Sequence, residues 1–289
     1  MTSAKTSYEF DAGGLNTWAD PEEFAVTAER IAEYAAATND PIEAHLRGEV
    51  APPVFAIVPA FDAMLTPVVD VAPIEIFGKV VHGEQDFWFH RPVRPGDVIT
   101  TRARAIGYDT VDTGARLSIH VECRAADGEL VNEQYLVAFF RNVDAGAGVG
   151  ESVPDHKLAD AVRTGEPLAV VTAHVDDDQT FRYAPASGDP MPIHLDEEVA
   201  KDAGLPGIIA HGLCTMAFAS WAVLTEVAGS EVNRLTRFAV RFSKFVLPGD
   251  DLQTRIWLTG SADGVTEYAF ETVRGDEVVL TDGLAVVAD

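Results

Sequence analysis

An internal repeat is the feature that most constrains how this chain of 289 residues can fold. The segment EYAAATNDPIEAH, which begins at Glu33, aligns with RYAPASGDPMPIH, which begins at Arg182, at an offset of 149 residues. A second pair, FHRPVRPGDVITTRARA from Phe89 and FSKFVLPGDDLQTRIWL from Phe242, aligns at an offset of 153. Two matches in the same order predict that one domain has been duplicated within the chain.

The seam between the two copies is predicted in the segment 142–167, which is rich in Gly, Asp and Pro and lacks strand alternation. We therefore divide the chain into a first domain, 1–145, a linker, 146–168, and a second domain, 169–289. The glycines of the linker lack the G-x-G-x-x-G spacing of a phosphate-binding loop, so we interpret this segment as a connector.

Each copy predicts a helical or turn-rich opening, an acid–imidazole loop, an apolar helix and then several strands. The opening TAERIAEYAAA has helical spacing, with Thr27 as its N-cap. The segment HGLCTMAFASWAVLTEVAG, from His211, is apolar on almost every side, which indicates a buried helix that ends at Gly229. The segments that follow alternate and break at turns such as Asp127-Gly128, which is typical of antiparallel strands. We expect an α+β fold in which an antiparallel sheet wraps around one buried helix, twice over.

Composition excludes several classes of partner. A formal charge of −25 disfavours binding to nucleic acid or to an anionic membrane. No apolar run approaches the ~20 residues of a membrane span, and the opening MTSAKTSYEFDAGG lacks the apolar core of a signal peptide, so we expect a cytoplasmic protein. Cys123 and Cys214 lie in apolar surroundings without partners at metal-ligand spacing, which predicts buried thiols and neither a disulfide nor a metal site.

The stretch YAPASGDPMPIHLDEEVAKDAGLPGIIAHGL, from Tyr183, resembles the signature of the MaoC-like, hydratase 2 type (R)-specific enoyl-CoA hydratases. That signature reads S-G-D-x-N-P-x-H-x-D, then A-x-x-x-G, then a hydrophobic run that ends in H-G. Met191 departs from it, because it stands where the family has an asparagine that helps to position the loop. With the repeat and the R-P-V-x-P-G-D element, the resemblance implies a double hot-dog fold. The matching positions are Ser187, Gly188, Asp189, Pro192, His194, Asp196, Ala200, Gly204, His211 and Gly212.

The resemblance also implies a reaction. This is the addition of water to a trans-2-enoyl thioester to give the (3R)-hydroxyacyl thioester, or the reverse dehydration, without a cofactor, in fatty acid or related acyl metabolism. Family precedent assigns Asp189 and His194 to the catalytic pair. A carboxylate and an imidazole suit this role because their different basicities let one accept a proton while the other donates. The prolines around them exclude a helix between the two residues and stiffen the loop.

Three further residues of the motif have two readings each. The backbone N–H of Gly212, at the start of the buried helix, is the candidate donor to the thioester oxygen, although helix packing could equally require a glycine. His211 either lines the substrate pocket or caps the helix. Asp196 could act as a catalytic acid, but we interpret it as the N-cap of the helix that follows it.

The first copy keeps Asp40 and His45, but its helix entry reads Ala51-Pro52-Pro53 and lacks the His-Gly pair. The family resemblance implies that such a degenerate half shapes a tunnel for the acyl chain and leaves one working site. It also implies a monomer or a homodimer.

A basic segment could hold the phosphates of CoA, because Arg237, Arg241 and Lys244 cluster with Arg234 in an otherwise acidic chain. Ordinary solvated strand faces are the alternative. An acidic acyl carrier protein would be repelled by this chain, so acyl-CoA is the more favoured substrate. Two other functions stay open, a hot-dog thioesterase and a non-catalytic subunit that binds acyl thioesters, for which Met191 is the main support.

Overall fold

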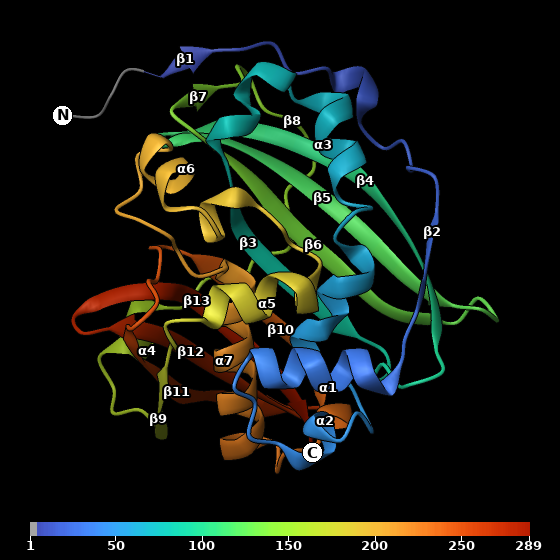
Figure 1. Ribbon diagram of the computed structural model, residues 1–289, viewed down its shortest axis with the longest axis vertical. Helices are drawn as coiled ribbons and strands as arrows, with labels where there is room; N and C mark the ends of the chain where they lie inside the picture. The colour runs from blue at the N-terminus through green and yellow to red at the C-terminus, as the bar shows by residue number, and fades with distance from the viewer. Residues whose placement is uncertain (1–4) are drawn as a thin grey trace.

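The computed structural model describes residues 5–289, so the first four residues of the predicted domain 1–145 lie outside it (Figure 1). Over the described range, eleven strands form one antiparallel sheet in the order β2-β4-β5-β6-β3-β10-β13-β12-β11-β9, with β8 paired to β4. Strands β1 and β7 form a separate parallel pair. The first half contains β1 (Thr6–Ser7), η1 (Ala12–Gly14), β2 (Glu22–Ala25), α1 (Ala28–Ala37), α2 (Glu43–Leu46), η2 (Pro53–Ala60), α3 (Leu65–Val71), η3 (Ile74–Lys79), β3 (Val80–Phe89), β4 (Val98–Val111), β5 (Gly114–Ala125), β6 (Leu130–Arg141) and β7 (Val143–Asp144).

The second half repeats this order of elements. From the centre of the sheet outwards, its strands follow the same order as the equivalent strands of the first half. The strands β3 and β10 lie side by side at the centre. The rest of the chain contains β8 (Val149–Gly150), α4 (Asp160–Arg163), β9 (Ala169–His174), α5 (Gln179–Ser187), η4 (Pro192–His194), α6 (Glu197–Asp202), α7 (Gly212–Val227), η5 (Val232–Arg234), β10 (Leu235–Phe242), β11 (Asp251–Ala262), β12 (Val265–Arg274) and β13 (Glu277–Ala288).

A pseudo-two-fold axis passes between β3 and β10. Glu84 pairs with Arg241, and Trp88 pairs with Arg237. At the offset of 153 residues Arg237 is the equivalent of Glu84 and Arg241 is the equivalent of Trp88, so the two pairs are related by the symmetry. Such reciprocal contacts define an isologous interface, as in a symmetric dimer. The duplication and the double hot-dog fold expected from the sequence are therefore confirmed, and the two copies share one continuous sheet.

The same axis passes between α1 and α5, which pack together over the central helices (Figure 1). The hydroxyls of Tyr34 and Tyr183, equivalent residues of the two copies, lie 3.2 Å apart and are buried. Arg30 donates to the carbonyl of Ala186, and Gln179, its equivalent, donates to the carbonyl of Ala37. Helix α1 begins after Thr27, whose side chain accepts a hydrogen bond from Arg30 N–H, as predicted.

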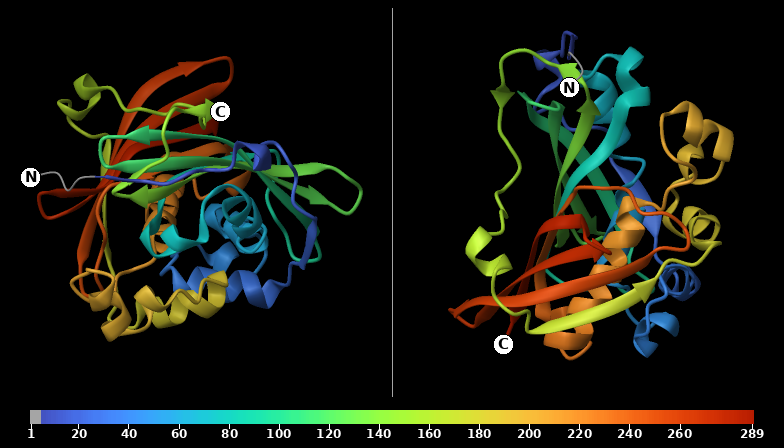
Figure 2. Two further views of the ribbon diagram at one scale, coloured as in Figure 1. Left: turned by 90° about the horizontal axis from the view of Figure 1, so that it is seen from above. Right: turned by 90° about the vertical axis from the view of Figure 1, so that its left-hand side faces the viewer.

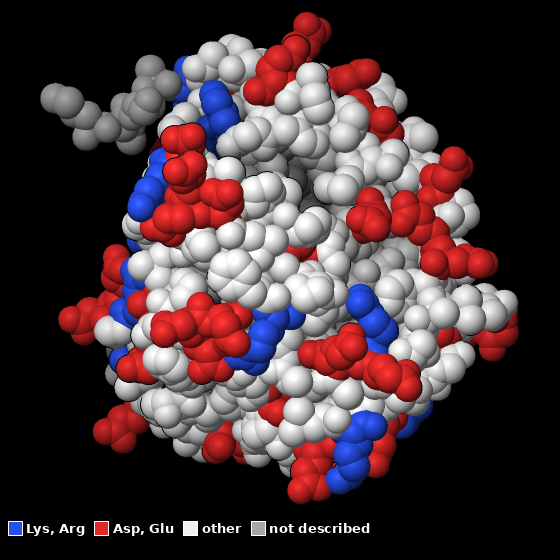
Figure 3. All heavy atoms as spheres, in the orientation of Figure 1, with Lys and Arg blue, Asp and Glu red and all other residues white. Residues whose placement is uncertain are grey.

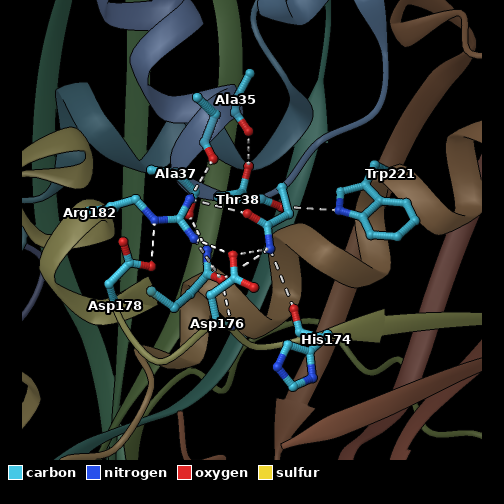
Figure 4. A network of polar contacts seen from close by, with 11 residues as sticks. Ala35, Ala37, Thr38, His174, Asp176, Asp178, Arg182 and Trp221 are labelled. Atoms are coloured by element: carbon cyan, nitrogen blue, oxygen red, sulfur yellow. Dashed lines mark hydrogen bonds and ion pairs between the residues drawn. The ribbon is translucent and has the colours of Figure 1, made fainter. Parts of the chain in front are cut away.

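A polar network fixes α5 against the first half (Figure 4). Arg182 donates to the carbonyl of Ala36 and to the side chains of Asp176 and Asn39. The indole of Trp221 on α7 donates to the carbonyl of Thr38. Because α1, α5 and α7 are joined in this way, the loop that leaves α5 starts from a rigid position.

The central helices differ between the halves. Helix α7 is buried along nearly its whole length, and Gly229 follows its end with φ +64°, as the sequence predicts. In the first half the expected single helix is wrong, because η2 and α3 are bent by 58° and Pro59 interrupts the hydrogen bonding of η2. Both cysteines are buried thiols, as expected. Among residues 5–289 no single helix has the length and apolar character of a membrane span, although η2 and α3 taken as a bent pair do.

The linker crosses the face of the sheet opposite the helices (Figure 2). It is more structured than the sequence suggests, since it contributes β8 and α4. His156 donates from Nδ1 to the carbonyl of Asp282 at 2.6 Å, and Arg163 pairs with Glu271 at 2.7 Å. The segment 146–168 is thus a strap bound to the sheet along its course.

Arg237 joins the two halves through a buried ion pair with Asp86, whose side chain is 2% exposed. We expect Arg237→Ala to lower the free energy of unfolding by about 3 kcal/mol, because it leaves a carboxylate buried without its counter-charge. Chemical denaturation measures this. Arg241→Ala is the matched control: Arg241 is 51% exposed and 3.8 Å from Glu84, so its loss should cost at most about 1 kcal/mol. Equal losses in the two variants would contradict the structural role of Arg237.

Candidate active site

The loop after α5 carries the first candidate catalytic residue, Asp189. Helix α5 ends at Gly188, which has φ +82°, a conformation that favours glycine. The carboxylate of Asp189 then accepts the N–H of Met191 through Oδ1 at 3.0 Å. This local turn fixes the carboxylate and leaves Oδ2 available to a ligand. The side chain of Met191 is 44% exposed, so the turn depends on its backbone N–H.

His194 lies at the end of η4, a single 3-10 turn. The expectation that no helix forms between Asp189 and His194 is therefore wrong. The Nδ1 of His194 donates to the carbonyl of Ile209 at 2.8 Å. Because Nδ1 carries the hydrogen in the neutral ring, Nε2 has a free lone pair. Asp196 follows and accepts the N–H groups of Glu198 and Val199, which confirms it as the N-cap of α6.

His211 stacks on His194, with ring centroids 3.8 Å apart and an interplanar angle of 26°. Its Nε2 donates to the carbonyl of Asp189 at 3.2 Å. His211 occupies the N-cap position of α7, as one of its two readings expects, although its side chain makes no hydrogen bond to the helix. The ring instead ties the two loops of the site together. Its buried Nδ1 finds no hydrogen-bond partner in the described part of the chain.

Asp189, His194 and His211 bring one ligand atom each to within 4.8 Å of one another. Such a trio could hold a metal ion, although His194 Nδ1 and His211 Nε2 each already donate to a backbone carbonyl. The surface is hollowed between α6 and α3, on the side where α5 lies (Figure 3). A small substrate can therefore approach this part of the molecule.

Burial sets the electrostatics of the site. It raises the pKa of Asp189, although attraction to His194 opposes this, and it lowers the pKa of His194. Burial and the neighbouring His194 lower the pKa of His211 to about 3. Both shifts of the catalytic pair favour its neutral forms, a carboxylic acid beside an imidazole with a free lone pair. Neighbouring groups with opposed shifts are typical of acid–base pairs.

Gly212 begins α7, a helix of 16 residues that is buried from Leu213 to Leu224. The N–H groups of a first helical turn have no partner inside the helix, and the helix dipole makes this end positive. A Cβ at Gly212 would lie 3.1 Å from the ring of Phe242. Packing against Phe242 and access to the backbone N–H therefore both favour glycine here.

The first copy shows what these residues do without the His-Gly pair. Ala51 N–H donates to Val93 as Ala210 N–H donates to Val246, which makes Pro52 and Pro53 the equivalents of His211 and Gly212. Here His45 Nδ1 binds the carboxylate of Asp40 at 2.7 Å, and both side chains are buried.

The predicted phosphate ligands do not come together. Phe238 and Val240 of β10 point into the core, so Arg237 and Arg241 lie on the opposite face of the sheet from α7. Arg237 is bound to Asp86 on that face, beside the linker. The structure therefore does not bring Arg237 or Arg241 to Gly212. Lys244 is exposed and lies two residues beyond Phe242 in the chain.

Sequence reasoning missed two aromatic neighbours of Gly212. Phe242 contacts its Cα side, and His82 from β3 of the first half packs edge to face on Phe242 with centroids 5.1 Å apart. Burial lowers the pKa of His82 to about 4, so the ring is neutral. Phe242 belongs to the second match of the repeat, and its place six residues before Pro248 of the P-G-D element is the signal that could have found it.

Comparisons with known proteins identify the family of this chain. The description "MaoC like domain" matches residues 160–279, and "FAS1-like, dehydratase domain region" matches residues 14–134. The 3-hydroxyacyl-thioester dehydratase Y of Mycobacterium tuberculosis is 30% identical over 241 residues, covering 80% of this chain and 79% of the relative. The chain belongs to the MaoC-like dehydratase family.

Other relatives are larger. The peroxisomal multifunctional enzyme type 2 of Mus musculus is 33% identical over 207 residues, which is 70% of this MaoC-like chain but only 27% of the relative. Among solved structures, a MaoC-like dehydratase from Phytophthora capsici superposes with a TM-score of 0.83 at 24% identity and covers 96% of this chain and 98% of its own. A Mycobacterium tuberculosis protein described as having a double hot-dog fold superposes with a TM-score of 0.60 at 14% identity, covering 94% and 95%.

The low pKa of His211 predicts a dependence of stability on pH. Below the ordinary histidine pKa of about 6.5 the unfolded chain takes up a proton that the folded His211 refuses, so stability falls as pH drops from about 6.5 towards 3. This contribution has a slope of about 1.4 kcal/mol per pH unit. We expect His211→Phe to show a flatter fall than the wild type in urea denaturation between pH 6 and pH 4. Identical slopes would contradict the assignment of a neutral His211.

Proposed function

We propose that this protein catalyses (R)-specific hydration of trans-2-enoyl thioesters, or the reverse dehydration of (3R)-hydroxyacyl thioesters, with acyl-CoA as the substrate. The observation that carries the proposal is the convergence of Asp189 and His194 beside the start of a buried helix at Gly212. Relatives named 3-hydroxyacyl-thioester dehydratase Y and, in Dictyostelium discoideum, probable enoyl-CoA hydratase 2 support it.

His194 acts as the base in the hydration direction. Its Nδ1–H is held by the carbonyl of Ile209, so Nε2 presents its lone pair to a water molecule. The lowered pKa keeps the ring unprotonated and able to accept. As Nε2 takes one proton, the water oxygen bonds to C3 and the electrons of the double bond move towards the thioester carbonyl.

Asp189 acts as the acid. Burial raises its pKa, which favours the protonated carboxyl that can donate to C2 as the carbonyl re-forms. The proton gained by His194 then returns to Asp189, so the pair is restored after each turnover. Both groups stand on one short loop, so water and proton add to the same face of the double bond.

The N–H of Gly212 stabilises the negative charge that develops on the thioester oxygen. The first turn of a helix presents free N–H groups in a fixed direction, and removal of one such donor costs about 3 kcal/mol in other enzymes. The first copy offers Pro53 at this place, which has no N–H. The proposed reaction therefore uses the second half alone.

Charge supports CoA as the carrier of the acyl group. With a formal charge of −25 the protein repels an acidic carrier protein at long range. Lys244, exposed and two residues beyond Phe242 in the chain, is the cation of the predicted cluster to which we assign the CoA phosphates. A cytoplasmic location and a monomeric or homodimeric state stay predictions.

The test is incubation with trans-2-enoyl-CoAs of graded length, followed by chiral analysis of the products. We expect (3R)-hydroxyacyl-CoA as the product. The acyl length at which the rate falls then gives the size of the acyl pocket. His194→Ala should lower kcat by about 10²–10⁴-fold, because it removes the base, while the melting transition stays cooperative. The (3S) product, or unchanged turnover by His194→Ala, would overturn the proposal.

Two other outcomes correspond to other hot-dog functions. Release of free thiol from a saturated acyl-CoA would show a thioesterase. Binding of enoyl-CoAs of every length without turnover would show a non-catalytic subunit. Either result without hydration of the enoyl-CoAs contradicts the proposal, and a saturated acyl-CoA added to the set of substrates distinguishes the two.

A further inference from the structure

A cavity of about 180 Å³ lies in the first half, beside Pro53 and Phe89. By the pseudo-two-fold symmetry these residues are the equivalents of Gly212 and Phe242, which face each other in the candidate active site. Val232 and Leu235 of the second half close the cavity from across the joint between β3 and β10. The cavity therefore occupies the place where the first copy would hold a thioester of its own.

This place cannot support the proposed hydration. Pro53 offers no N–H to a thioester oxygen, and His45 is bound to Asp40 at 2.7 Å with its side chain fully buried. The shape of a binding site has been kept while the groups that perform chemistry are absent or engaged elsewhere.

The lining favours an apolar occupant, because most of it is apolar, although His90, Arg91, Asn233 and Thr236 also contribute. It includes Pro52, Ala56 and Val93 besides the residues named above. The guanidinium of Arg91, which lines the cavity, pairs with Asp97 at 2.9 Å and with Glu129 at 2.8 Å. These two carboxylates offset its charge, so its attraction for a phosphate is weak. The volume is below the about 300–1,000 Å³ of sites for drug-sized ligands, so only a short chain fits.

We propose that this cavity is a second, non-catalytic site that binds the short acyl chain of an acyl thioester and leaves its CoA part in solvent. The inference rests on the substrate class proposed for the second half, because the cavity is the equivalent, in the first copy, of the candidate active site. A chain bound here is held without reaction, since neither an oxyanion donor nor a free base faces it.

The test is the stoichiometry of hexanoyl-CoA binding, measured by calorimetry on the full chain. Hexanoyl-CoA has no double bond to hydrate, so the measurement does not depend on turnover. Asn233→Trp places an indole at the mouth of the cavity from an exposed position, and Val232→Trp does so from its neighbour. Glu231→Trp is the matched control, because Glu231 is exposed on the same turn and does not line the cavity.

We expect two molecules per chain for the wild type and Glu231→Trp, and one for Asn233→Trp and Val232→Trp. Hydration of crotonyl-CoA should be unchanged in all three variants. A single site in the wild type that Asn233→Trp removes also supports the second site. The inference is overturned if both cavity variants bind as many molecules as the wild type. If the protein binds two molecules but hydrates no enoyl-CoA, the proposed function alone has failed.

Discussion

The antiparallel pairing of β3 with β10 is the interaction on which the rest of this structure depends. It joins two copies of one domain into a single sheet, and the register pairs equivalent residues reciprocally across the axis. Asp86 and Arg237 bury an ion pair at this joint, and the hydroxyls of Tyr34 and Tyr183 meet on the same axis between α1 and α5. Because the two copies belong to one chain, the candidate active site and its equivalent in the first copy are held in one sheet.

Because the copies share one frame, the differences between them isolate what chemistry requires. In the first copy an acid and an imidazole bind each other at 2.7 Å, and the buried Nε2 of His45 has no partner among the described residues. In the second copy each is held by the backbone instead, Asp189 by Met191 N–H and His194 by the Ile209 carbonyl. The second oxygen of Asp189 and the Nε2 of His194 make no hydrogen bond among the described residues, which leaves them available to a substrate.

Proton transfer in the second copy also depends on the helix entry. Gly212 leaves its backbone N–H open, and His211 stacks on His194 while it binds the carbonyl of Asp189. The first copy has two prolines there, which close the oxyanion position and leave a cavity with apolar walls. On the two proposals above, the second copy carries the site that reacts, and the equivalent site of the first copy binds an acyl chain without reaction.

Much of this could be predicted from the sequence, because its signals are local. The offsets of 149 and 153 residues predicted the duplication, and the apolar segment from His211 predicted the buried helix. The placement of Arg237 and Arg241 could not be predicted, since the face of a strand depends on the register of its neighbours. The bend between η2 and α3 and the stacking of His211 on His194 depend likewise on tertiary packing.

The most direct test of this asymmetry compares two equivalent substitutions, Asp189→Asn and Asp40→Asn. With crotonyl-CoA, we expect Asp189→Asn to lower kcat by about 10²–10⁴-fold, because the acid is lost. Asp40→Asn should retain kcat and instead lower the free energy of unfolding by about 1–3 kcal/mol, because the hydrogen bond to the buried His45 is weakened. Equal losses of kcat in the two variants would contradict the account.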